Sequence, residues 1–282
     1  MRVKAPAKIN LTLRVLAKLK DGYHRIDSVM VPITLYDVIE IRKTRKQAKR
    51  IAVRCGQPEV PEGKENLVYR AAALMLGQRA VAESVAIRIR KSIPVGAGLG
   101  GGSSDAAATL VGLNRLFRFG LSAPKLAALG AKIGSDVPFF IYQKPARIGG
   151  KGEKVKPLAR LPTLWLVVLY PGFPVATAWA YRNVHPKLTK LVTNTSIIAS
   201  LKTRESLARI LTNDLEAVTI PRYSELAVLK QKLLAEGAQA ALMSGSGSSV
   251  FGIFKSRMAA RGAFRRLQKE EKTQAYLVHS LS

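Results

Sequence analysis

Five of the seven residues from Gly96 to Gly102 are glycine, and this segment stands between a predicted strand and a predicted helix. Glycine has no side chain, so its backbone adopts positive φ angles and approaches a ligand closely. The start of the following helix directs more N–H groups and the positive end of the helix dipole to the same place. The segment therefore predicts an anion-binding loop suited to a polyphosphate. The alternative is a flexible loop that only caps a helix.

This loop differs from the two commonest nucleotide-binding loops. No lysine follows its last glycine, as it does in the P-loop, and its glycine spacing is not that of the dinucleotide-binding fingerprint. Ser103 and Ser104 follow the glycines and could add hydroxyl donors or help to hold a metal ion.

Strands and helices are mixed throughout the chain, which predicts an α+β (mixed α/β) fold. Alternation with a period of two predicts strands over 9–15 and 85–89. Residues 29–41 have the composition of strands interrupted at Pro32 and at Tyr36-Asp37. The basic stretch 42–54 is expected to be a solvated hairpin or loop.

Helices are predicted over 66–76, 106–117 and 206–218, and Ser104-Asp105 is the expected cap of the second. A chain of 282 residues corresponds to one large domain or two ordinary ones. The composition changes between Lys144 and Pro162, where glycine, proline and basic residues concentrate. We therefore predict an N-terminal domain over 1–155 and a C-terminal domain over 156–282.

The composition excludes several classes of protein. No apolar run approaches the roughly 18 residues of a membrane span, and the N-terminus has no hydrophobic stretch behind its charges. The single cysteine, Cys55, rules out an internal disulfide, and three scattered histidines leave no thiolate-type zinc site. We expect a soluble, cytoplasmic protein. Its net charge of +28 favours anionic ligands, although a general bias toward basic surfaces would give the same value.

Three motifs resemble those of a known family. PVGAGLGGGSSDAA, over 94–107, resembles the phosphate loop of the GHMP kinases, which include galactokinase and the homoserine, mevalonate and phosphomevalonate kinases. PAKINLTL, over 6–13, and MSGSGSSVFG, over 243–252, resemble the first and third motifs of that family. DGYH, over 21–24, and GSDVPFF, over 134–140, narrow the resemblance to members whose acceptor is a cytidine diphosphate-linked methylerythritol.

The resemblance implies a two-domain GHMP kinase fold with the active site in the cleft between the domains. It implies ATP as co-substrate, Mg²⁺ as the cation, and transfer of the γ-phosphoryl group to the 2-hydroxyl of the acceptor. The expected partner is this small molecule, with no membrane and no specific nucleic acid. The alternatives are a GHMP kinase for mevalonate, homoserine or a sugar, and a nucleic-acid-binding protein suggested by the charge.

Asp136 is the candidate base, because a carboxylate at this apparent helix entry can accept or orient the proton of the attacking hydroxyl. Its alternative role is a helix N-cap, which Pro138 supports, and both roles can coexist. Lys8 is a lone cation inside an apolar strand. It can pair with Asp136 and stabilise charge on the attacking oxygen. Its alternative is an ordinary outward-facing strand lysine.

The resemblance also implies a set of ATP contacts in the glycine segment and two flanking positions. These residues are Pro94, Val95, Gly96, Ala97, Gly98, Leu99, Gly100, Gly101, Gly102, Ser103, Ser104, Lys91 and Asn66. For the last two, a solvated lysine and a helix cap are the alternatives. The second glycine segment, SGSGSS from Ser244, either positions substrate phosphates or allows close backbone packing.

The predicted substrate residues are Asn10, Tyr23, His24 and Thr177. Asn10 lies on the same strand face as Lys8 by the period of two. An aromatic ring and an imidazole at Tyr23 and His24 suit stacking on cytosine and bonding to its polar edge. Thr177 resembles a substrate-proximal position, as does the pair Asn213-Asp214, although an alanine precedes Thr177 where we would expect a small hydroxyl residue.

Overall fold

The computed structural model describes residues 1–44, 50–78, 83–158, 161–185, 206 and 210–281. The chain forms two compact units, each assembled from separate stretches. The first unit contains Met1–Ala7, Leu35–Val95 and Gly100–Gln143, and the second contains Lys8–Thr34, Gly96–Leu99 and Lys144–Ser282. The boundary at residue 155 stays a prediction, and these units group residues 8–34 with the C-terminal part of the chain.

In the first unit, strand β3 (Ile51–Cys55) pairs in parallel with β4 (Ser84–Arg90). Strand β4 pairs antiparallel with the C-terminal half of β2 (His24–Thr44), and β1 (Arg2–Lys18) lies beside β2. The predicted alternation in β4 is confirmed, because Val85, Ile87 and Ile89 are buried and the intervening arginines are exposed.

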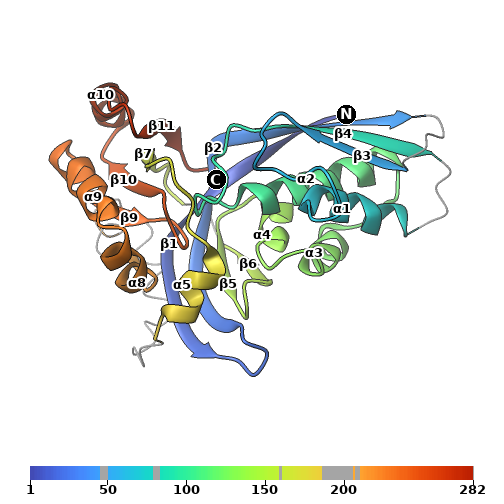
Figure 1. Cartoon of the computed structure of the whole chain (residues 1–282), viewed down its shortest axis with the longest axis horizontal. Helices are drawn as coiled ribbons and strands as arrows, with labels where there is room; N and C mark the ends of the chain where they lie inside the picture. The colour runs from blue at the N-terminus through green and yellow to red at the C-terminus, as the bar shows by residue number, and fades with distance from the viewer. Residues whose placement is uncertain (45–49, 79–82, 159–160, 186–205, 207–209, 282) are drawn as a thin grey trace. The chain divides into compact units, whose positions relative to one another are not determined.

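Among the described residues of the first unit, four helices are present, and α1 and α2 pack side by side (Figure 1). They are α1 (Leu67–Leu76), α2 (Gly101–Leu116), α3 (Ala123–Ala131) and α4 (Val137–Tyr142). Helix α2 lies close to the sheet at Gly112, where an added Cβ would come within 2.6 Å of Ile41 Cδ1. This glycine therefore permits close packing of helix on sheet.

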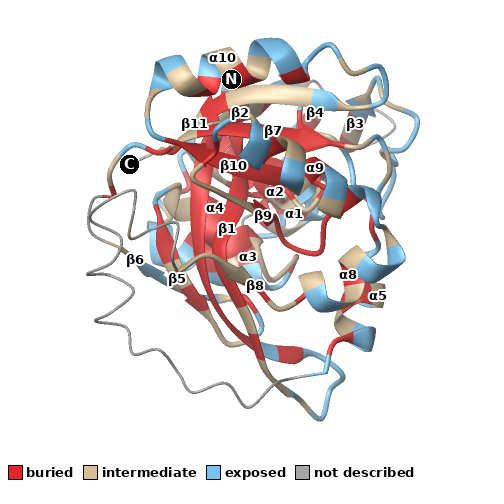
Figure 2. Cartoon of the chain, turned by 90° about the vertical axis from the view of Figure 1, so that its left-hand side faces the viewer, coloured by how far each residue is buried: buried red, intermediate tan, exposed pale blue. Residues whose placement is uncertain are grey.

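In the second unit, β1 and β2 are buried along most of their length (Figure 2). Strand β8 (Thr212–Asn213) extends the sheet in parallel with β1, and β5 (Ala146–Gly149) pairs with β2 and with β6 (Lys154–Pro157). A second, antiparallel sheet has the order β11 (Gln274–His279), β7 (Trp165–Tyr170), β10 (Val250–Phe254) and β9 (Ala240–Met243).

In the part of the second unit that the structure describes, the helices are α5 (Thr177–Asn183), α8 (Glu216–Arg222), α9 (Glu225–Ala235) and α10 (Arg257–Leu267). One buried core joins the second sheet to α9 and α10, through side chains such as Val167, Leu229 and Ala263. No helix among the described residues is long and apolar enough to cross a membrane.

The predicted interruptions of residues 29–41 are wrong, because β2 runs through both positions. Pro32 lacks an N–H group, but its carbonyl still accepts a hydrogen bond from Leu281 N. Asp37 is fully buried within the strand, and its carboxylate is bonded to groups far away in the sequence. The solvated hairpin or loop predicted over 42–54 is also wrong for the described residues. Residues 42–44 end β2 and 51–54 belong to β3, and β4 lies between these two strands; residues 45–49 lie outside the described residues.

Two helix predictions need correction. Helix α2 begins at Gly101 with Gly100 as its N-cap residue, so Ser104 and Asp105 lie inside the helix and do not cap it. The single helix expected over 206–218 is broken by β8, and part of this stretch lies outside the described residues. The helices predicted over 66–76 and 106–117 are otherwise confirmed.

Candidate active site

The first glycine segment has the backbone that its composition predicts. Gly96, Gly98 and Gly100 adopt φ angles of 66°, 75° and 73°. Gly100 is the left-handed N-cap of α2, and no described side chain forms a cap hydrogen bond there. The first N–H groups of a helix have no partner within it. The amides that open α2 are therefore available to an anion in front of the loop.

The second glycine segment, residues 244–249, packs directly on the first. Ser244 Oγ donates to Gly98 O at 3.0 Å, and Ser249 N donates to Ala97 O at 3.1 Å. A Cβ added to Gly98 would lie 2.1 Å from Ser244 O. Of the two predicted roles for this segment, the structure supports close backbone packing.

Lys8 is buried next to the first glycine segment. The residue is only 3% exposed, and its Nζ donates hydrogen bonds to Asn10 Oδ1 at 2.6 Å and to Gly98 O at 2.7 Å. The alternative of an outward-facing lysine is therefore wrong. The shared strand face of Lys8 and Asn10 is confirmed.

Behind Lys8, the orientation of Asn10 is fixed by a chain of hydrogen bonds. Asn10 Nδ2 donates to Ser28 Oγ at 2.8 Å, and Ser28 Oγ donates to Thr12 O at 2.5 Å. Both polar atoms of the Asn10 amide are thus engaged by protein groups. The sequence motifs did not single out Ser28. The signal that could have identified it is a serine among the buried residues of a strand.

Asp136 occupies the N-cap position of α4 in the first unit, whereas Lys8 belongs to the second. Asp136 is half-buried and its carboxylate makes no cap hydrogen bond. The position is that of a cap, but the side chain is not used as one. Its carboxylate therefore remains available for another role.

Lys91 lies in a buried cluster of charges rather than in solvent. Its ammonium group forms ion pairs with Asp37 and with Asp105 Oδ2, the latter at 3.0 Å, and all three side chains are at most 4% exposed. Asp37 Oδ1 also accepts hydrogen bonds from Ser92 N at 2.6 Å and Ile93 N at 2.9 Å. The cluster thus joins β2, the exit of β4 and helix α2 just before the glycine segment.

The cluster holds two carboxylates and one ammonium group, and this arrangement shifts the proton affinities of Asp105 and Lys91. Burial raises the pKa of Asp105 to about 7; Lys91 opposes this shift and Asp37 adds to it. Burial acts to lower the pKa of Lys91, but the charges of Asp105 and Asp37 outweigh it and the net shift is upward. Asp105 Oδ1 is buried without a hydrogen-bond partner. The sequence predicted Asp37 at a strand interruption and Asp105 in a helix cap, and it did not predict the cluster; the available signal was Asp37, because an acid inside an apolar strand requires a partner.

Two predicted ligand residues have structural contacts. Asn66 caps α1 by accepting from Val68 N at 2.8 Å, and its Nδ2 donates to Pro61 O at 2.5 Å. Thr177 opens α5, and its Oγ1 lies 3.1 Å from Ser246 Oγ in the second glycine segment. The cap alternative for Asn66 is confirmed, and an ATP contact by this residue stays a prediction.

Tyr23 and His24 have different environments. Tyr23 is 59% exposed, with Lys151 Nζ 5.0 Å from its ring centroid. His24 is buried, and its ring lies 5.7 Å from that of Tyr181 at a tilt of 33°. Burial, helped by the charge of Lys18, lowers the pKa of His24. Near pH 7 its imidazole is therefore neutral, with one donor and one acceptor nitrogen.

Asn213 and Asp214 support the backbone. Asn213 Nδ2 donates to Met243 O and to Gly245 O, both at 2.8 Å, and Asp214 Oδ2 accepts from Val15 N at 2.8 Å. These hydrogen bonds give both polar side chains a structural role that does not require a substrate. Among the described residues, no cluster of three or more histidine, cysteine or acidic side chains could hold a metal ion by itself.

The family comparisons agree with the motifs. The model described as the GHMP kinases N-terminal domain matches residues 66–144, and the GHMP kinases C-terminal model matches residues 197–273. A relative from Citrifermentans bemidjiense named 4-diphosphocytidyl-2-C-methyl-D-erythritol kinase is 44% identical over 269 residues, covering 95% of each chain. A relative of the same name from Syntrophotalea carbinolica is 42% identical and covers 99% of this chain and 98% of its own.

Solved structures give the same result for the fold. A crystal structure of 4-(cytidine 5'-diphospho)-2C-methyl-D-erythritol kinase is 35% identical, covers all of both chains and superposes with a TM-score of 0.85. A homoserine kinase from Cytophaga hutchinsonii is only 19% identical but has a TM-score of 0.78, which shows the shared fold. The mixed α/β fold, the two matched family domains and the similarity over nearly the whole chain show that this protein belongs to the GHMP kinases.

Proposed function

We propose that this chain transfers the γ-phosphoryl group of ATP to the 2-hydroxyl group of 4-diphosphocytidyl-2-C-methyl-D-erythritol, a step in the non-mevalonate route to isoprenoid precursors. The observation that carries the proposal is the identity of 42–44% with kinases of that name over nearly the full length of the chain. Divergent GHMP kinases with other acceptors share the fold at 15–19% identity.

ATP phosphates bind in front of the first glycine segment in this proposal. The left-handed Gly100 and the open amides at the start of α2 support it, because such amides and the helix dipole favour anions. The charged cluster of Lys91, Asp37 and Asp105 acts indirectly, by holding the strand exit and helix that flank the loop.

In the transfer step, the bond between the γ-phosphorus and the β,γ-bridging oxygen breaks and ADP leaves. The 2-hydroxyl oxygen of the acceptor forms the new bond to phosphorus, and Asp136 takes its proton or orients it. Lys8 stabilises the negative charge on the attacking oxygen. Asn10 and Ser28 are positioning residues, because their hydrogen bonds fix the direction of the Lys8 ammonium group.

Mg²⁺ is the proposed cation. It usually binds phosphates and waters with only one or two protein oxygens. Ser103 and Ser104 are the candidate protein ligands, and Ser104 Oγ is buried without a hydrogen-bond partner at the start of α2. When bound, the cation would neutralise charge on the transferred phosphate.

Cytosine recognition is assigned to Tyr23 and His24. The exposed ring of Tyr23 offers a stacking surface. The neutral imidazole of His24, held against Tyr181, offers one donor and one acceptor to the polar edge of a base. Neither mevalonate nor homoserine has a base for these two side chains to recognise.

The substrate assignment is tested by measuring ADP release with a panel of acceptors: the cytidylyl-methylerythritol, mevalonate, homoserine and galactose. We expect kcat/KM for the first to exceed the others by orders of magnitude, and excess chelator to abolish activity. A preference for any other acceptor of the panel would refute the assignment while leaving the family intact.

The catalytic assignment is tested by Asp136→Asn, Lys8→Met and the double variant, with kcat measured at saturating substrates. Losing general-base help costs about 10²–10⁴-fold in rate, and residues that act together give losses that do not multiply. We expect each single variant to keep its melting temperature while kcat falls, and the double variant to be little worse. A fully active Asp136→Asn, or losses that multiply, would overturn the joint role.

A further inference from the structure

One face of the sheet in the first unit carries an unusual arrangement of charges. Arg54 on β3 lies opposite Arg88 on β4, and Arg88 lies opposite Glu40 on β2. Their side chains point away from the sheet face on which the neighbouring Ile41 meets α2, because side chains alternate along a strand. Two arginines therefore stand side by side on the open face of the sheet.

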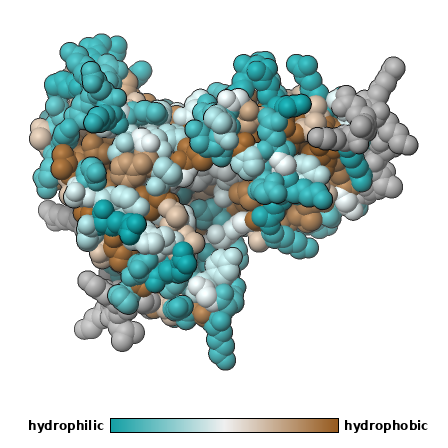
Figure 3. Space-filling view, in the orientation of Figure 1, coloured by the Kyte–Doolittle hydropathy of each residue, from teal (hydrophilic) through white to brown (hydrophobic). Residues whose placement is uncertain are grey.

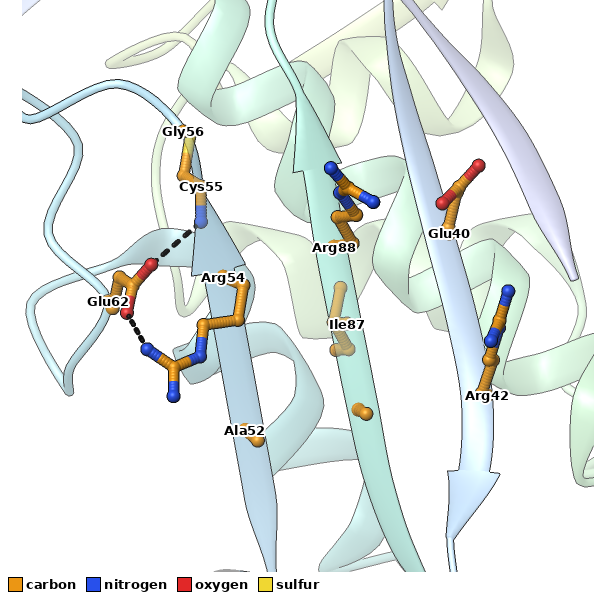
Figure 4. A pocket seen from close by; sticks show the side chains of 10 residues that line it. Glu40, Arg42, Ala52, Arg54, Cys55, Gly56, Glu62, Ile87 and Arg88 are labelled. Carbon is orange, nitrogen blue, oxygen red and sulfur yellow. Dashed lines mark hydrogen bonds and ion pairs between the residues drawn. The ribbon is translucent and has the colours of Figure 1, made fainter.

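The adjacent row of the same face is built from small side chains. Ala52 on β3 lies opposite Ala86 on β4, and Ala86 lies opposite Arg42 on β2. Both alanines, together with Arg42, Arg54 and Arg88, line a hollow of about 490 Å³. Figure 4 shows Ala52 and the three arginines on these neighbouring strands. This volume falls in the range of small-molecule sites, about 300–1,000 Å³.

Both acidic groups at the hollow are already paired, Glu40 with arginines outside it and Glu62 with Arg54 at its edge. Glu40 Oε1 pairs with Arg2 at 2.9 Å and with Arg90 at 3.2 Å, and Glu62 pairs with Arg54 at 3.1 Å.

Arg42 and Arg88, by contrast, make no ion pair or hydrogen bond with any residue that the structure describes. Like charges that lie opposite each other on neighbouring strands destabilise a sheet, and Arg54 and Arg88 form such a pair. An anion between the two arginines and Arg54 would relieve that repulsion.

We propose that this hollow binds a phosphorylated small molecule, with a phosphate or diphosphate group held by Arg42 and Arg88. Guanidinium groups bind phosphate oxygens in pairs, and such charge-assisted hydrogen bonds are stronger than neutral ones. The alanine floor leaves room for the rest of the ligand. Among the described residues that line the hollow none is aromatic, so they offer no stacking surface of the kind that single-stranded nucleic acid requires. The site is independent of the proposed catalytic residues.

Cys55 makes this site directly measurable. It is the single cysteine of the chain, it lines the hollow and it is partly exposed. Side chains alternate along β3, so its thiol lies on the face opposite to that of Arg54. Its rate of alkylation by iodoacetamide therefore reports on this end of β3, beside the hollow, and not on the glycine segments. The probe ligand is inorganic pyrophosphate, titrated at constant ionic strength with NaCl as the reference anion.

The test compares the full-length protein with the double variant Arg42→Ala/Arg88→Ala. The matched control is Arg261→Ala/Arg265→Ala, which removes the same charge from the exposed, hydrophilic side of α10 (Figure 3). We expect pyrophosphate to slow alkylation in a saturable way. Loss of two exposed charge-assisted bonds should raise the half-protecting concentration about tenfold or more in the first variant, and the control should match the parent.

Shifts of the Ala86 and Arg88 amide signals in ¹H–¹⁵N spectra give a second readout that does not need a reactive thiol. The proposal is overturned if pyrophosphate leaves both readouts unchanged, if NaCl gives equal protection, or if the double variant responds like the parent. Protection by a single-stranded RNA oligonucleotide without protection by pyrophosphate would also overturn it, in favour of a nucleic-acid surface.

Discussion

The two glycine-containing segments, residues 96–102 with five glycines and residues 244–249 with two glycines and four serines, are held in place by different chemistry. Behind the first, Asp105 in the second turn of α2 belongs to a buried cluster of charges with Lys91 and Asp37. The second is held in large part by neutral hydrogen bonds, in which the Asn213 amide donates to Met243 O and Gly245 O. Glycine content thus predicts a backbone geometry, whereas the supporting groups decide how each segment responds to pH and substitution.

The largest effect is expected where the two segments touch. Gly98→Ala places a Cβ 2.1 Å from Ser244 O, at a φ of 75° that alanine rarely adopts. Overpacking and backbone strain each cost about 1–3 kcal/mol, so we expect a loss of about 4 kcal/mol in the free energy of unfolding, measured by urea denaturation. Gly102→Ala is the control, because its φ is not positive and its Cβ would meet only Leu67 Cδ1 at 3.7 Å. Equal stability of the two variants would show that the contact between segments is not tight.

Gly100→Val distinguishes the role of Gly100 in the loop's conformation from its predicted contact with ATP. The residue is left-handed and a β-branched side chain there costs about 1–3 kcal/mol. We also expect the KM for ATP to rise at least about tenfold, because the side chain crowds the proposed phosphate site. Gly120→Val is the matched control, with a φ of 71° in open space. It should lose similar stability and keep the KM for ATP; a normal KM in Gly100→Val would place the phosphates elsewhere.

Asn213→Ala tests the neutral support of the second segment. The variant leaves two carbonyl oxygens without their buried donor, which costs about 2 kcal/mol in unfolding free energy. Asn183→Ala removes an exposed amide from α5 and should change stability by less than about 0.5 kcal/mol. A cost for Asn213→Ala as small as this control would mean that the segment is held by its own backbone bonds.

The alternation and composition of short sequence segments correctly predicted the elements that bury one face along their length. The alternation of β4 and the helical composition of α1 are examples, because one buried face per element decides them. The continuity of β2 through Asp37 was missed, because the groups that stabilise this acid come from residues 91–93, more than 50 positions away. A polar residue inside a strand is therefore mistaken for the end of the strand when its hydrogen-bond partners are distant in the sequence.

The same limit applies to the site. The sequence motifs singled out Lys8, Asn10 and Lys91, but did not show that Lys91 is held between two carboxylates or that Asn10 depends on Ser28. The start of α2 was placed several residues late, because glycines disfavour a helix locally. In the structure these glycines open the helix, where a residue without a side chain leaves the amides uncovered.

The charged support of the first segment makes a prediction about pH. In the unfolded chain Asp105 titrates near 3.8, and burial in the folded protein raises its pKa to about 7. Between these values the folded state binds more protons than the unfolded state, so this group lowers stability as the pH rises through the window and adds no further change above it. One proton gives a slope of at most about 1.4 kcal/mol per pH unit.

Asp105→Asn removes this titration while keeping the shape of the side chain. Near pH 4 the protonated acid and the amide are alike, so parent and variant should have nearly equal unfolding free energies. As the pH rises to 8, the parent must ionise a second carboxylate beside Asp37, and the variant should become the more stable of the two. The measurement is urea denaturation at intervals from pH 4 to 8. Asn213→Ala provides the internal comparison: its support is neutral, so its curve should stay parallel to that of the parent across the range. If the Asp105→Asn curve were also parallel, the buried cluster would not titrate, and the two glycine segments would be supported by groups of equivalent pH response.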